Sequence, residues 1–510
     1  MDNIIKKNYI NFICLVFGIF IIYCSFPNKN IYIPYLAWFC LVPLLWILKN
    51  QVNFKWKLLY SWLFFQPFFL LLFSFKESPI PPNYNIKPAF DGVLLFTLLF
   101  PIIYSLFFSC IAHFSKKSSF KNILLQTSLW VLFEHFFIAK IIGFPLSLAL
   151  TNFNIANVIQ VASYGGIDSV SAMIFAVNCG IVQIIDINIY RLTKSRSNNR
   201  LFHFLTPFLI TCTLVAILIL WGIIRINTSV STGKEVRFSL IQPNASQYEL
   251  YLVATSKPYF RRLLSNLIEL STKAKREFTP DVIIFPEGVL KEKIFTKDFY
   301  YEFQKFLNKL KTPLIIQSGV MDSALEKEYS ATIYFNKNGV LKKTNYKQKL
   351  VPIFESNLYN IGHIQNVFFD VMDNVDIGTM ICFEILFSKI SRGLYKNNAN
   401  VLIALSNNGY FGSSNWAFLH AAYTPFRAVE YGRPFILVNN TGFSVVTTSY
   451  GKITHLSPLG QRCISNVFIT TSEQKTFYGE YPLIFIGICI GIVIISMIDL
   501  ILSRKKYEYN

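Results

Sequence analysis

A cysteine, a glutamate and a lysine, each at the end of a strand-like run, are the residues of this chain best suited to covalent chemistry. Cys382 ends the β-type run that begins at Gly378, and a helix is expected to begin near Glu384. A thiol at such a strand-to-helix turn lies close to unpaired backbone N–H groups, where a nucleophile is useful. A lone cysteine is more often a buried core residue, so its neighbours must decide between the two interpretations.

A cysteine nucleophile needs a base, or a cation that lowers its pKa, and a group that holds the oxyanion formed on a carbonyl. Glu287 directly follows the apolar strand predicted at Asp281–Pro286, and open α/β sheets place their sites at the carboxyl ends of strands. Lys347 lies at the rim of another strand-like segment. Taken singly, Glu287 is typical of a solvated strand end, and Lys347 is one of four lysines between positions 342 and 349.

The composition is that of a membrane protein. The 510 residues are 53% hydrophobic and 16% aromatic, and the mean hydropathy is +0.41, whereas soluble proteins average about 45–50% apolar residues. The net charge of +20 does not indicate nucleic-acid binding, because lysine and arginine occur in short clusters between apolar runs rather than on one face of the chain. The basic residues are therefore interpreted as topology signals.

Eight apolar runs approach or exceed the ~20 residues that a helix needs to cross a bilayer. They span about Tyr9–Phe26, Ile31–Leu48, Leu58–Phe75, Phe90–Phe114, Ile123–Ile142, Ile159–Ile185, Phe204–Ile226 and Leu483–Leu502. The first resembles a signal peptide but lacks a small-residue cleavage site, so we expect it to be retained. The sequence thus predicts a membrane domain of seven spans over residues 1–228, and an eighth span with a tail over 481–510.

The charges that flank these runs predict the orientation of the chain. Fifteen basic residues flank one side and four lie in the short loops of the other. The fifteen are Lys6, Lys7, Lys49, Lys55, Lys57, Lys116, Lys117, Lys121, Arg191, Lys194, Arg196, Arg200, Arg504, Lys505 and Lys506, and the four are Lys29, Lys76, Lys87 and Lys140. By the positive-inside rule both termini are expected in the cytoplasm and residues 229–480 outside it.

The polar segment 229–480 is predicted to be one α/β domain, without repeats or a low-complexity linker. Its first half reads β-α-β-α-β over Val236–Gln242, Tyr251–Arg276, Asp281–Pro286, Tyr300–Leu310 and Leu314–Gly319. A hairpin is expected around Asn338–Gly339, followed by strands at Asn366–Met372, Gly378–Cys382 and Val401–Ser406, a helix at Ser414–Tyr431, and strands at Phe435–Asn439 and Phe443–Ser449.

The cysteines and histidines indicate neither a disulfide framework nor a metal site. Seven of the nine cysteines lie in apolar runs, which leaves only Cys382 and Cys463 in the polar segment, and no Cys-x-x-Cys pair occurs. The six histidines are scattered without ligand spacing. We therefore expect chemistry without a metal or other cofactor. Within the apolar runs, Glu134, His135 and Asp168 are either functional or paired inside the bundle, and no chemistry is assigned to them.

Three motifs around the chemical residues resemble the Glu-Lys-Cys triad of the nitrilase superfamily. They are Phe285-Pro286-Glu287, then Tyr346-Lys347 with Leu350-Val351-Pro352 and Glu355, then Ile381-Cys382-Phe383-Glu384. Placed between seven spans and an eighth, the domain is similar to the apolipoprotein N-acyltransferase family of bacterial lipoprotein maturation. The resemblance extends to Gly143-Phe144-Pro145, Val236-Arg237, Gln242-Pro243-Asn244, Ser406-Asn407, Phe411-Gly412, Arg427-Ala428, Glu430 and Gly432-Arg433-Pro434.

The resemblance implies an αββα sandwich and a role for each residue. Glu287 would be the general base, Cys382 the nucleophile, and Lys347 with the backbone N–H of Phe383 would hold the oxyanion. Glu355 would support Lys347 or the base. Glu384 would suit the start of a helix, and a structural role for it is at least as well supported as a catalytic one.

The resemblance also implies the substrates and the compartment. A membrane phospholipid would donate an acyl chain through a Cys382 thioester to the α-amino group of a diacylglyceryl-cysteine on an apolipoprotein. The protein would be a monomer in the bacterial inner membrane, with a periplasmic catalytic domain. Two alternatives are a membrane-tethered amidase or hydrolase that uses the same triad, and a non-catalytic transporter or scaffold. The eight apolar runs count against the first, and the joint presence of all three residues counts against the second.

Several positions depart from the family's usual residues. Phe383 stands where tyrosine is common, Asn408 and Tyr410 stand where Asp and Trp are usual, and Tyr251 falls where tryptophan is expected. Ile353-Phe354 likewise replaces a Phe-Gly pair. These differences affect the expected substrate-entry contacts and leave the triad intact.

Overall fold

The computed structural model describes residues 2–73, 87–114, 119–193, 198–229, 233–290, 297–322, 327–352, 355–356, 358–362, 368–372, 374–412 and 414–508. The chain forms two compact units. Unit 1 contains Met1–Ser74, Val93–Thr228 and Glu480–Asn510, and unit 2 contains Phe75–Gly92 and Ser229–Gly479. The departure at Ile353-Phe354 lies outside the described residues.

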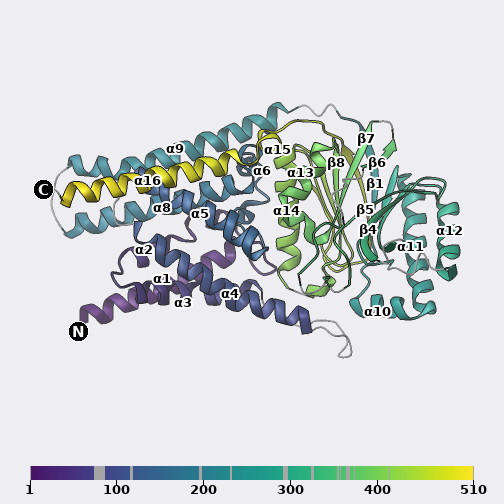
Figure 1. Ribbon diagram of the computed structural model, residues 1–510, viewed down its shortest axis with the longest axis horizontal. Coiled ribbons are helices and arrows are strands. Elements are labelled where there is room, and N and C mark those ends of the chain that lie inside the picture. The colour runs from purple at the N-terminus through teal and green to yellow at the C-terminus, as the bar shows by residue number, and fades with distance from the viewer. Residues whose placement is uncertain are drawn as a thin grey trace. The chain divides into compact units, whose positions relative to one another are not determined.

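Unit 1 is helical, and α1 and α16 place both termini at the same end of this unit (Figure 1). Its helices are α1 (Asp2–Ser25), η1 (Pro34–Phe39), α2 (Val42–Lys49), α3 (Phe54–Leu72), α4 (Lys87–Ile111), α5 (Phe120–Leu132), η3 (Phe133–Ile142), η4 (Leu148–Asn152), α6 (Ala156–Ile159), α7 (Ala162–Gly165), α8 (Ile167–Thr193), α9 (Asn198–Thr228) and α16 (Ile484–Glu508). Within the described residues, five helical segments are long and apolar enough to cross a membrane. They are Asn8–Ser25, Phe120–Ile142, Ile167–Ile185, Leu205–Thr228 and Ile484–Leu502.

Five of the eight predicted spans thus correspond to helical segments of the described chain that are long and apolar enough to cross a membrane. The apolar run at Ile31–Leu48 is divided into η1 and α2, and each of these begins with a proline at its first or second position. Proline fits the first turn of a helix but breaks the interior, so this run does not form one long helix. The run at Ile159–Ile185 is likewise interrupted at Gly166, which has φ +69°.

Unit 2 contains two six-stranded sheets. Sheet A has the order β12-β1-β2-β3-β4-β5 and sheet B the order β11-β10-β9-β8-β7-β6. The strands of sheet A are β1 (Glu235–Gln242), β2 (Val282–Ile284), β3 (Leu314–Asp322), β4 (Lys327–Phe335), β5 (Leu341–Tyr346) and β12 (Cys463–Thr470). Those of sheet B are β6 (Phe368–Met372), β7 (Val375–Ile381), β8 (Val401–Ser406), β9 (Phe435–Asn439), β10 (Val445–Thr447) and β11 (Ile453–Leu456).

The inner faces of the two sheets share one apolar core. Phe238 and Ile284 of sheet A belong to the same buried cluster as Ile377 and Ile403 of sheet B. Because β1 to β3 are parallel neighbours, as are β7 to β9, the carboxyl ends of these strands gather at one edge of each sheet. Strands that are buried on both faces read as continuous apolar runs, which is why Val282–Ile284 and Val401–Leu405 were recognisable in the sequence.

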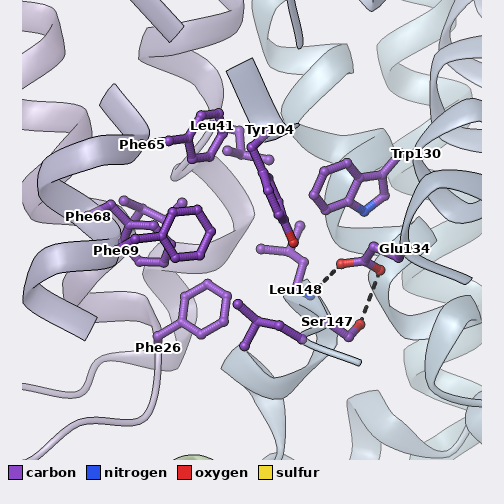
Figure 2. Close-up of a pocket in the computed structure, with 12 residues that line it drawn as sticks. Phe26, Leu41, Phe65, Phe68, Phe69, Tyr104, Trp130, Glu134, Ser147 and Leu148 are labelled. Atoms are coloured by element: carbon purple, nitrogen blue, oxygen red, sulfur yellow. Dashed lines mark hydrogen bonds between the residues drawn. The ribbon is translucent and has the colours of Figure 1, made fainter. Parts of the chain in front are cut away.

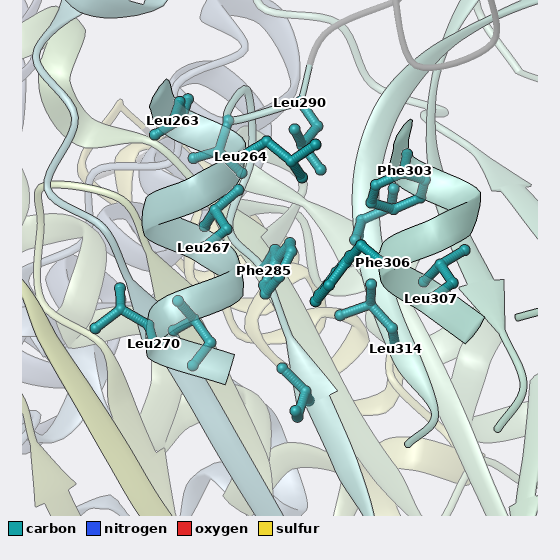
Figure 3. Packing of buried hydrophobic residues seen from close by; sticks show 14 of the residues in the cluster. Leu263, Leu264, Leu267, Leu270, Phe285, Leu290, Phe303, Phe306, Leu307 and Leu314 are labelled. Atoms are coloured by element: carbon teal, nitrogen blue, oxygen red, sulfur yellow. The ribbon is translucent and has the colours of Figure 1, made fainter. Parts of the chain in front are cut away.

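Helices cover the outer face of each sheet and complete an αββα sandwich (Figure 1). On sheet A these are α10 (Gln247–Thr255), α11 (Lys257–Phe278) and α12 (Lys297–Leu310), and on sheet B α13 (Ser388–Lys396) and α14 (Trp416–Tyr431). Figure 3 shows leucines of α11 and phenylalanines of α12 directed at Phe285, which follows β2. The predicted sandwich is confirmed by this arrangement.

The structure differs from the predicted elements in two helices and in one strand that pairs with β1. The helix expected over Tyr251–Arg276 is two helices, because Ser256 is extended and a proline begins α11. The helix expected from Ser414 begins at Trp416. The prediction also missed β12, which pairs with the whole length of β1. The first residues of the strand predicted at Asn366–Met372 lie outside the described residues, and the rest is β6.

Candidate active site

Cys382 lies in a strained turn at the end of β7. Its φ is +48°, a left-handed conformation that costs a residue with a Cβ about 1–3 kcal/mol. The next element is η6, a 3₁₀ segment over Cys382–Leu386, and α13 begins only at Ser388. The helix expected near Glu384 therefore starts four residues later, because the backbone reverses at the cysteine. Such strain persists only where surrounding contacts hold it.

Glu287 follows β2 at the carboxyl end of the strand, as the sequence predicted. Gly288 has φ +77° and so turns the chain directly after the glutamate. The Gly288 N–H donates to Oε1 of Gln317 over 2.7 Å. Gln317 also donates to Ser330 Oγ over 3.0 Å, so the turn that carries Glu287 is tied to β3 and β4.

Lys347 directly follows β5, and its side chain is fully buried. Its Nζ lies 3.3 Å from Oε1 of Glu287 and 2.7 Å from Oε1 of Glu355. The backbone N–H of Lys347 still donates to the Ser330 carbonyl at 2.8 Å. The other oxygen of Glu355 accepts the Val351 N–H over 2.8 Å. Glu355 thus connects the Lys347 ammonium group to the backbone of the loop after β5.

The three residues of the predicted triad meet between the two sheets. The Glu287 carboxylate accepts a hydrogen bond from Lys347 and interacts with the Cys382 side chain. The Cys382 thiol also interacts with Ser406, which ends the neighbouring strand β8. The carboxyl, the ammonium and the thiol therefore form one cluster, although 60 residues separate Glu287 from Lys347 in sequence.

Burial and charge decide the protonation of this cluster. Burial raises the pKa of the Glu287 carboxyl, a rise that Lys347 opposes and Glu355 increases. Burial alone would lower the pKa of Lys347, but the two carboxylates outweigh it and raise that pKa. Burial and the Glu287 carboxylate raise the pKa of the Cys382 thiol. The resting site therefore holds a neutral thiol, which must lose its proton before or during an attack on a carbonyl.

Direct contacts between the sheets set the spacing of Lys347 and Cys382. Asn345, two residues before the lysine, donates from Nδ2 to the Thr379 carbonyl over 2.8 Å. The hydroxyls of Thr332 and Thr379 lie 2.6 Å apart. These polar contacts cross the mainly apolar interface between the sheets, so they fix the position of β5 relative to β7.

Glu384 braces the two loops that carry Lys347 and Cys382. Its Oε2 accepts the Ile381 N–H over 2.7 Å, and its Oε1 accepts the N–H groups of Gln348 and Lys349 over 2.6 and 3.1 Å. Burial raises its pKa to about 7, although these N–H groups favour the ionised form. The geometry supports the structural interpretation of Glu384, because its carboxyl group contacts the amide before the cysteine and two amides of the loop after β5.

Helix α14 supplies two contacts that the sequence did not reveal. Arg427 donates from Nε to the Ile385 carbonyl over 2.8 Å and from Nη2 to the Leu386 carbonyl over 3.2 Å. A buried ion pair with Glu430 holds the guanidinium in place. His420 lies 3.1 Å from the carbonyl oxygen of Cys382. Arg427 was part of the family resemblance and His420 was not, but both residues lie about 40 positions later in the chain, so no local pattern placed either of them beside the cysteine turn.

The residues that depart from the family pattern have different environments. Phe383 is buried and packs edge-on against Phe387, with 5.0 Å between the ring centroids. Asn408 is buried, and its backbone N–H donates to Asn439 Oδ1 over 3.1 Å. Tyr251 is exposed on α10, and Tyr410 is half-buried in η7 (Asn408–Phe411). Within the described residues no group of three or more metal-binding side chains is arranged around a common point.

Glu134, His135 and Asp168 have polar partners within unit 1. Glu134 lies on η3, accepts the Leu148 N–H over 2.7 Å and the Ser147 hydroxyl over 3.1 Å, and borders a small apolar cavity lined by aromatic side chains (Figure 2). His135 Nδ1 lies 2.7 Å from Oδ2 of Asp168. These contacts satisfy the structural expectation for the three residues.

The fold and the cluster at the strand ends define a nitrilase-type catalytic domain joined to membrane helices. Residues 241–470 match the carbon-nitrogen hydrolase family model, and residues 19–180 match the model of the apolipoprotein N-acyltransferase N-terminal domain. The chain is 24% identical to an apolipoprotein N-acyltransferase of Thermotoga maritima over 93% of this chain and 90% of that protein. It is 22% identical to apolipoprotein N-acyltransferase 1 of Treponema denticola over 97% of each.

These matches span both parts of the chain. The protein therefore belongs to the apolipoprotein N-acyltransferase family. Among solved structures, Saccharomyces cerevisiae Nit3, a member of branch 10 of the nitrilase superfamily, aligns with a TM-score of 0.39 and 18% identity over 48% of this chain and 92% of that chain.

Replacing Glu384 with glutamine is expected to loosen the site. Glutamine offers one acceptor oxygen where the carboxylate uses two, so at least one of the three N–H groups loses its partner, at a cost of about 1–3 kcal/mol. The unfolding temperature of the purified protein in detergent should fall relative to Glu473→Gln, which changes an exposed glutamate. Equal unfolding temperatures for the two variants would contradict the bracing role.

The substitution Glu355→Gln is expected to shift the pH dependence of Cys382 acylation. Burial and Glu355 raise the pKa of Glu287. In the wild type Glu287 therefore becomes protonated at a higher pH than an ordinary glutamate, and the rate of Cys382 acylation should fall as the pH drops through the pKa of Glu287. Removal of the Glu355 charge should move this acid limb to lower pH. A limb that stays or moves upward would exclude Glu287 as the titrating base.

Proposed function

We propose that this protein transfers an acyl chain from a membrane phospholipid to the α-amino group of the diacylglyceryl-cysteine of apolipoproteins, the last step of bacterial lipoprotein maturation. The observation that carries this proposal is the buried cluster of Glu287, Lys347 and Cys382 in a chain of this family. The relatives in Thermotoga maritima and Treponema denticola are named for this activity, and the matches cover 90% and 97% of their length.

In the first half-reaction Glu287 takes the proton of the Cys382 thiol as the sulfur attacks an ester carbonyl of the phospholipid. The negative charge moves to the carbonyl oxygen, where the Lys347 ammonium and the Phe383 N–H receive it. The intermediate then collapses, the carbon–oxygen bond of the ester breaks, and the proton held by Glu287 passes to the departing glycerol oxygen. A lysophospholipid leaves and the acyl chain remains as a thioester on Cys382.

In the second half-reaction the amine of the lipoprotein attacks this thioester. Glu287 accepts the proton that the nitrogen loses, the carbon–sulfur bond breaks, and the proton returns to the sulfur. A thioester is a good acyl donor to an amine, and two successive transfers through one covalent intermediate give ping-pong kinetics. The charge on Lys347 suits both steps, because its two carboxylate partners keep it protonated. No cofactor takes part in this scheme.

The finer membrane topology is also part of the proposal. Five apolar segments of the described chain support membrane integration, and eight spans would also require the runs that include α2, α3 and α4. The distribution of basic residues supports cytoplasmic termini, with residues 1–228 and 481–510 in or at the inner membrane and 229–480 in the periplasm. The catalytic domain would then have access to lipids of the outer leaflet. The proposed protein is a monomer.

Incubation of the purified, full-length protein with acyl-labelled phospholipid should produce a label on Cys382 that hydroxylamine removes. Cys382→Ala should lack the adduct and lose lipoprotein N-acylation by at least about 10³-fold, because the nucleophile is gone. Glu287→Gln should fold normally and form no adduct. Mass spectrometry of the Cys382 peptide and transfer to a diacylglyceryl peptide are the two readouts.

Cys463→Ala is the matched control, because Cys463 is the other cysteine of unit 2, and its adduct and activity should equal those of the wild type. Retention of N-acylation by both Cys382→Ala and Cys382→Ser would refute the covalent mechanism. An adduct that is released only to water would favour a hydrolase.

The proposed orientation predicts which side of the membrane two exposed lysines face. A cysteine at Lys452, in unit 2, should react with a membrane-impermeant maleimide in cells with a permeabilised outer membrane. A cysteine at Lys55, in unit 1, should react only after the inner membrane is opened. Both signals are compared with the parent protein, which contains nine cysteines of its own. The reverse labelling pattern would overturn the topology.

A further inference from the structure

The imidazole of His420 lies against the peptide group that links Cys382 to Phe383. Its Nε2 is 3.1 Å from the Cys382 carbonyl oxygen. The ring is fully buried on α14 and stacks on Trp416, with 5.8 Å between the centroids and 19° between the planes. Since α14 packs against η6, the imidazole is held firmly on one side of the turn that carries the cysteine.

The partner of Nε2 identifies which nitrogen bears the proton. A carbonyl oxygen can only accept, so Nε2 must donate the hydrogen bond. Burial lowers the pKa of His420 to about 4, so the ring is neutral at pH 7 and has this one N–H. Within the described residues Nδ1 has no hydrogen-bond partner. The only donor of the ring is therefore directed at the Cys382 carbonyl, and Nε2 is not available as a base for the thiol.

The orientation of this carbonyl also sets the orientation of the next N–H. A trans peptide is planar, and its C=O and N–H point in opposite directions. The Cys382 carbonyl and the Phe383 N–H belong to the same peptide plane, so a donor that holds the carbonyl on one side holds the N–H toward the other. Phe383 is the second residue of η6, a position at which the N–H has no acceptor within the helix.

We propose that His420 is a positioning residue, which holds the Cys382–Phe383 peptide so that the Phe383 N–H faces the oxyanion formed on the substrate. The inference rests on the proposed covalent mechanism and adds a residue to it. The left-handed backbone of Cys382 makes such a restraint necessary, because the strained peptide would otherwise relax by rotation. Arg427 restrains the following carbonyls of the turn, but in the described structure it has no contact with the Cys382 carbonyl.

Two carboxamide variants separate the hydrogen bond from the packing of the ring. His420→Gln can place an N–H near the position of Nε2, whereas the shorter side chain of His420→Asn cannot reach it. Each full-length variant is treated with p-nitrophenyl butyrate, whose p-nitrophenolate leaves as Cys382 forms a thioester, and separately with iodoacetamide. Alkylation by iodoacetamide displaces iodide at a saturated carbon and forms no oxyanion. Mass spectrometry follows both reactions at the Cys382 peptide.

We expect His420→Asn to slow thioester formation about 10–100-fold and to alkylate Cys382 within about two-fold of the wild-type rate. His420→Gln should recover most of the thioester rate. Equal acylation rates for the two variants, or an alkylation rate that falls in parallel with acylation, would overturn the inference. The butyrate ester tests His420 independently of the natural substrates: a wild type that reacts with it but not with phospholipid would refute the proposed acyl donor and leave the role of His420 standing.

Discussion

The active site depends on one backbone constraint, the left-handed conformation of Cys382 at the end of β7. A residue with a side chain occupies this region at a cost, so the turn needs contacts from several directions. Glu384 holds the amide before the cysteine, His420 holds its carbonyl, and Arg427 holds the carbonyls that follow. The strain and its restraints place the Cys382 sulfur and the Phe383 amide on the same short segment, which is the arrangement that the proposed attack on a carbonyl uses.

A second constraint is the charge buried beside the thiol. Lys347 lies between two carboxylates, and breaking one member of such a buried group leaves an uncompensated charge. Lys347 also opposes the rise that burial causes in the pKa of Glu287, and in the proposed mechanism it faces the oxyanion. The hydrogen bond between Asn345 and Thr379 joins the two sheets and preserves the spacing of Lys347 and Cys382. Stability and chemistry thus draw on the same side chains.

Membership of the family and the two sheets followed from patterns that are local in the sequence. Buried parallel strands leave continuous apolar runs, and Glu287 and Cys382 directly follow such runs. Lys347 follows β5, which is antiparallel and largely exposed, so this lysine was singled out by its place at a strand end and by the motif around it. The span count was less predictable. Hydropathy alone does not register that Pro34 and Pro43 divide an apolar run into η1 and α2. Strand β12 was missed because Ser465 is on its buried face and Phe468 on its exposed face, so the sequence does not alternate between apolar and polar residues as the burial does. Its pairing with β1 is also a long-range property.

The sequence by itself determined which residues could act, because a nucleophile, a base and a cation each stand at a strand end and the motifs around them match a known family. It also determined the apolar segments and the asymmetry of the basic residues. Only the tertiary structure decided that Glu355 contacts the lysine, that Glu384 braces two loops, and that His420 and Arg427 reach the cysteine turn from α14. The physical reason is that these contacts join residues from separate elements, whose proximity depends on how two sheets and a helix pack together.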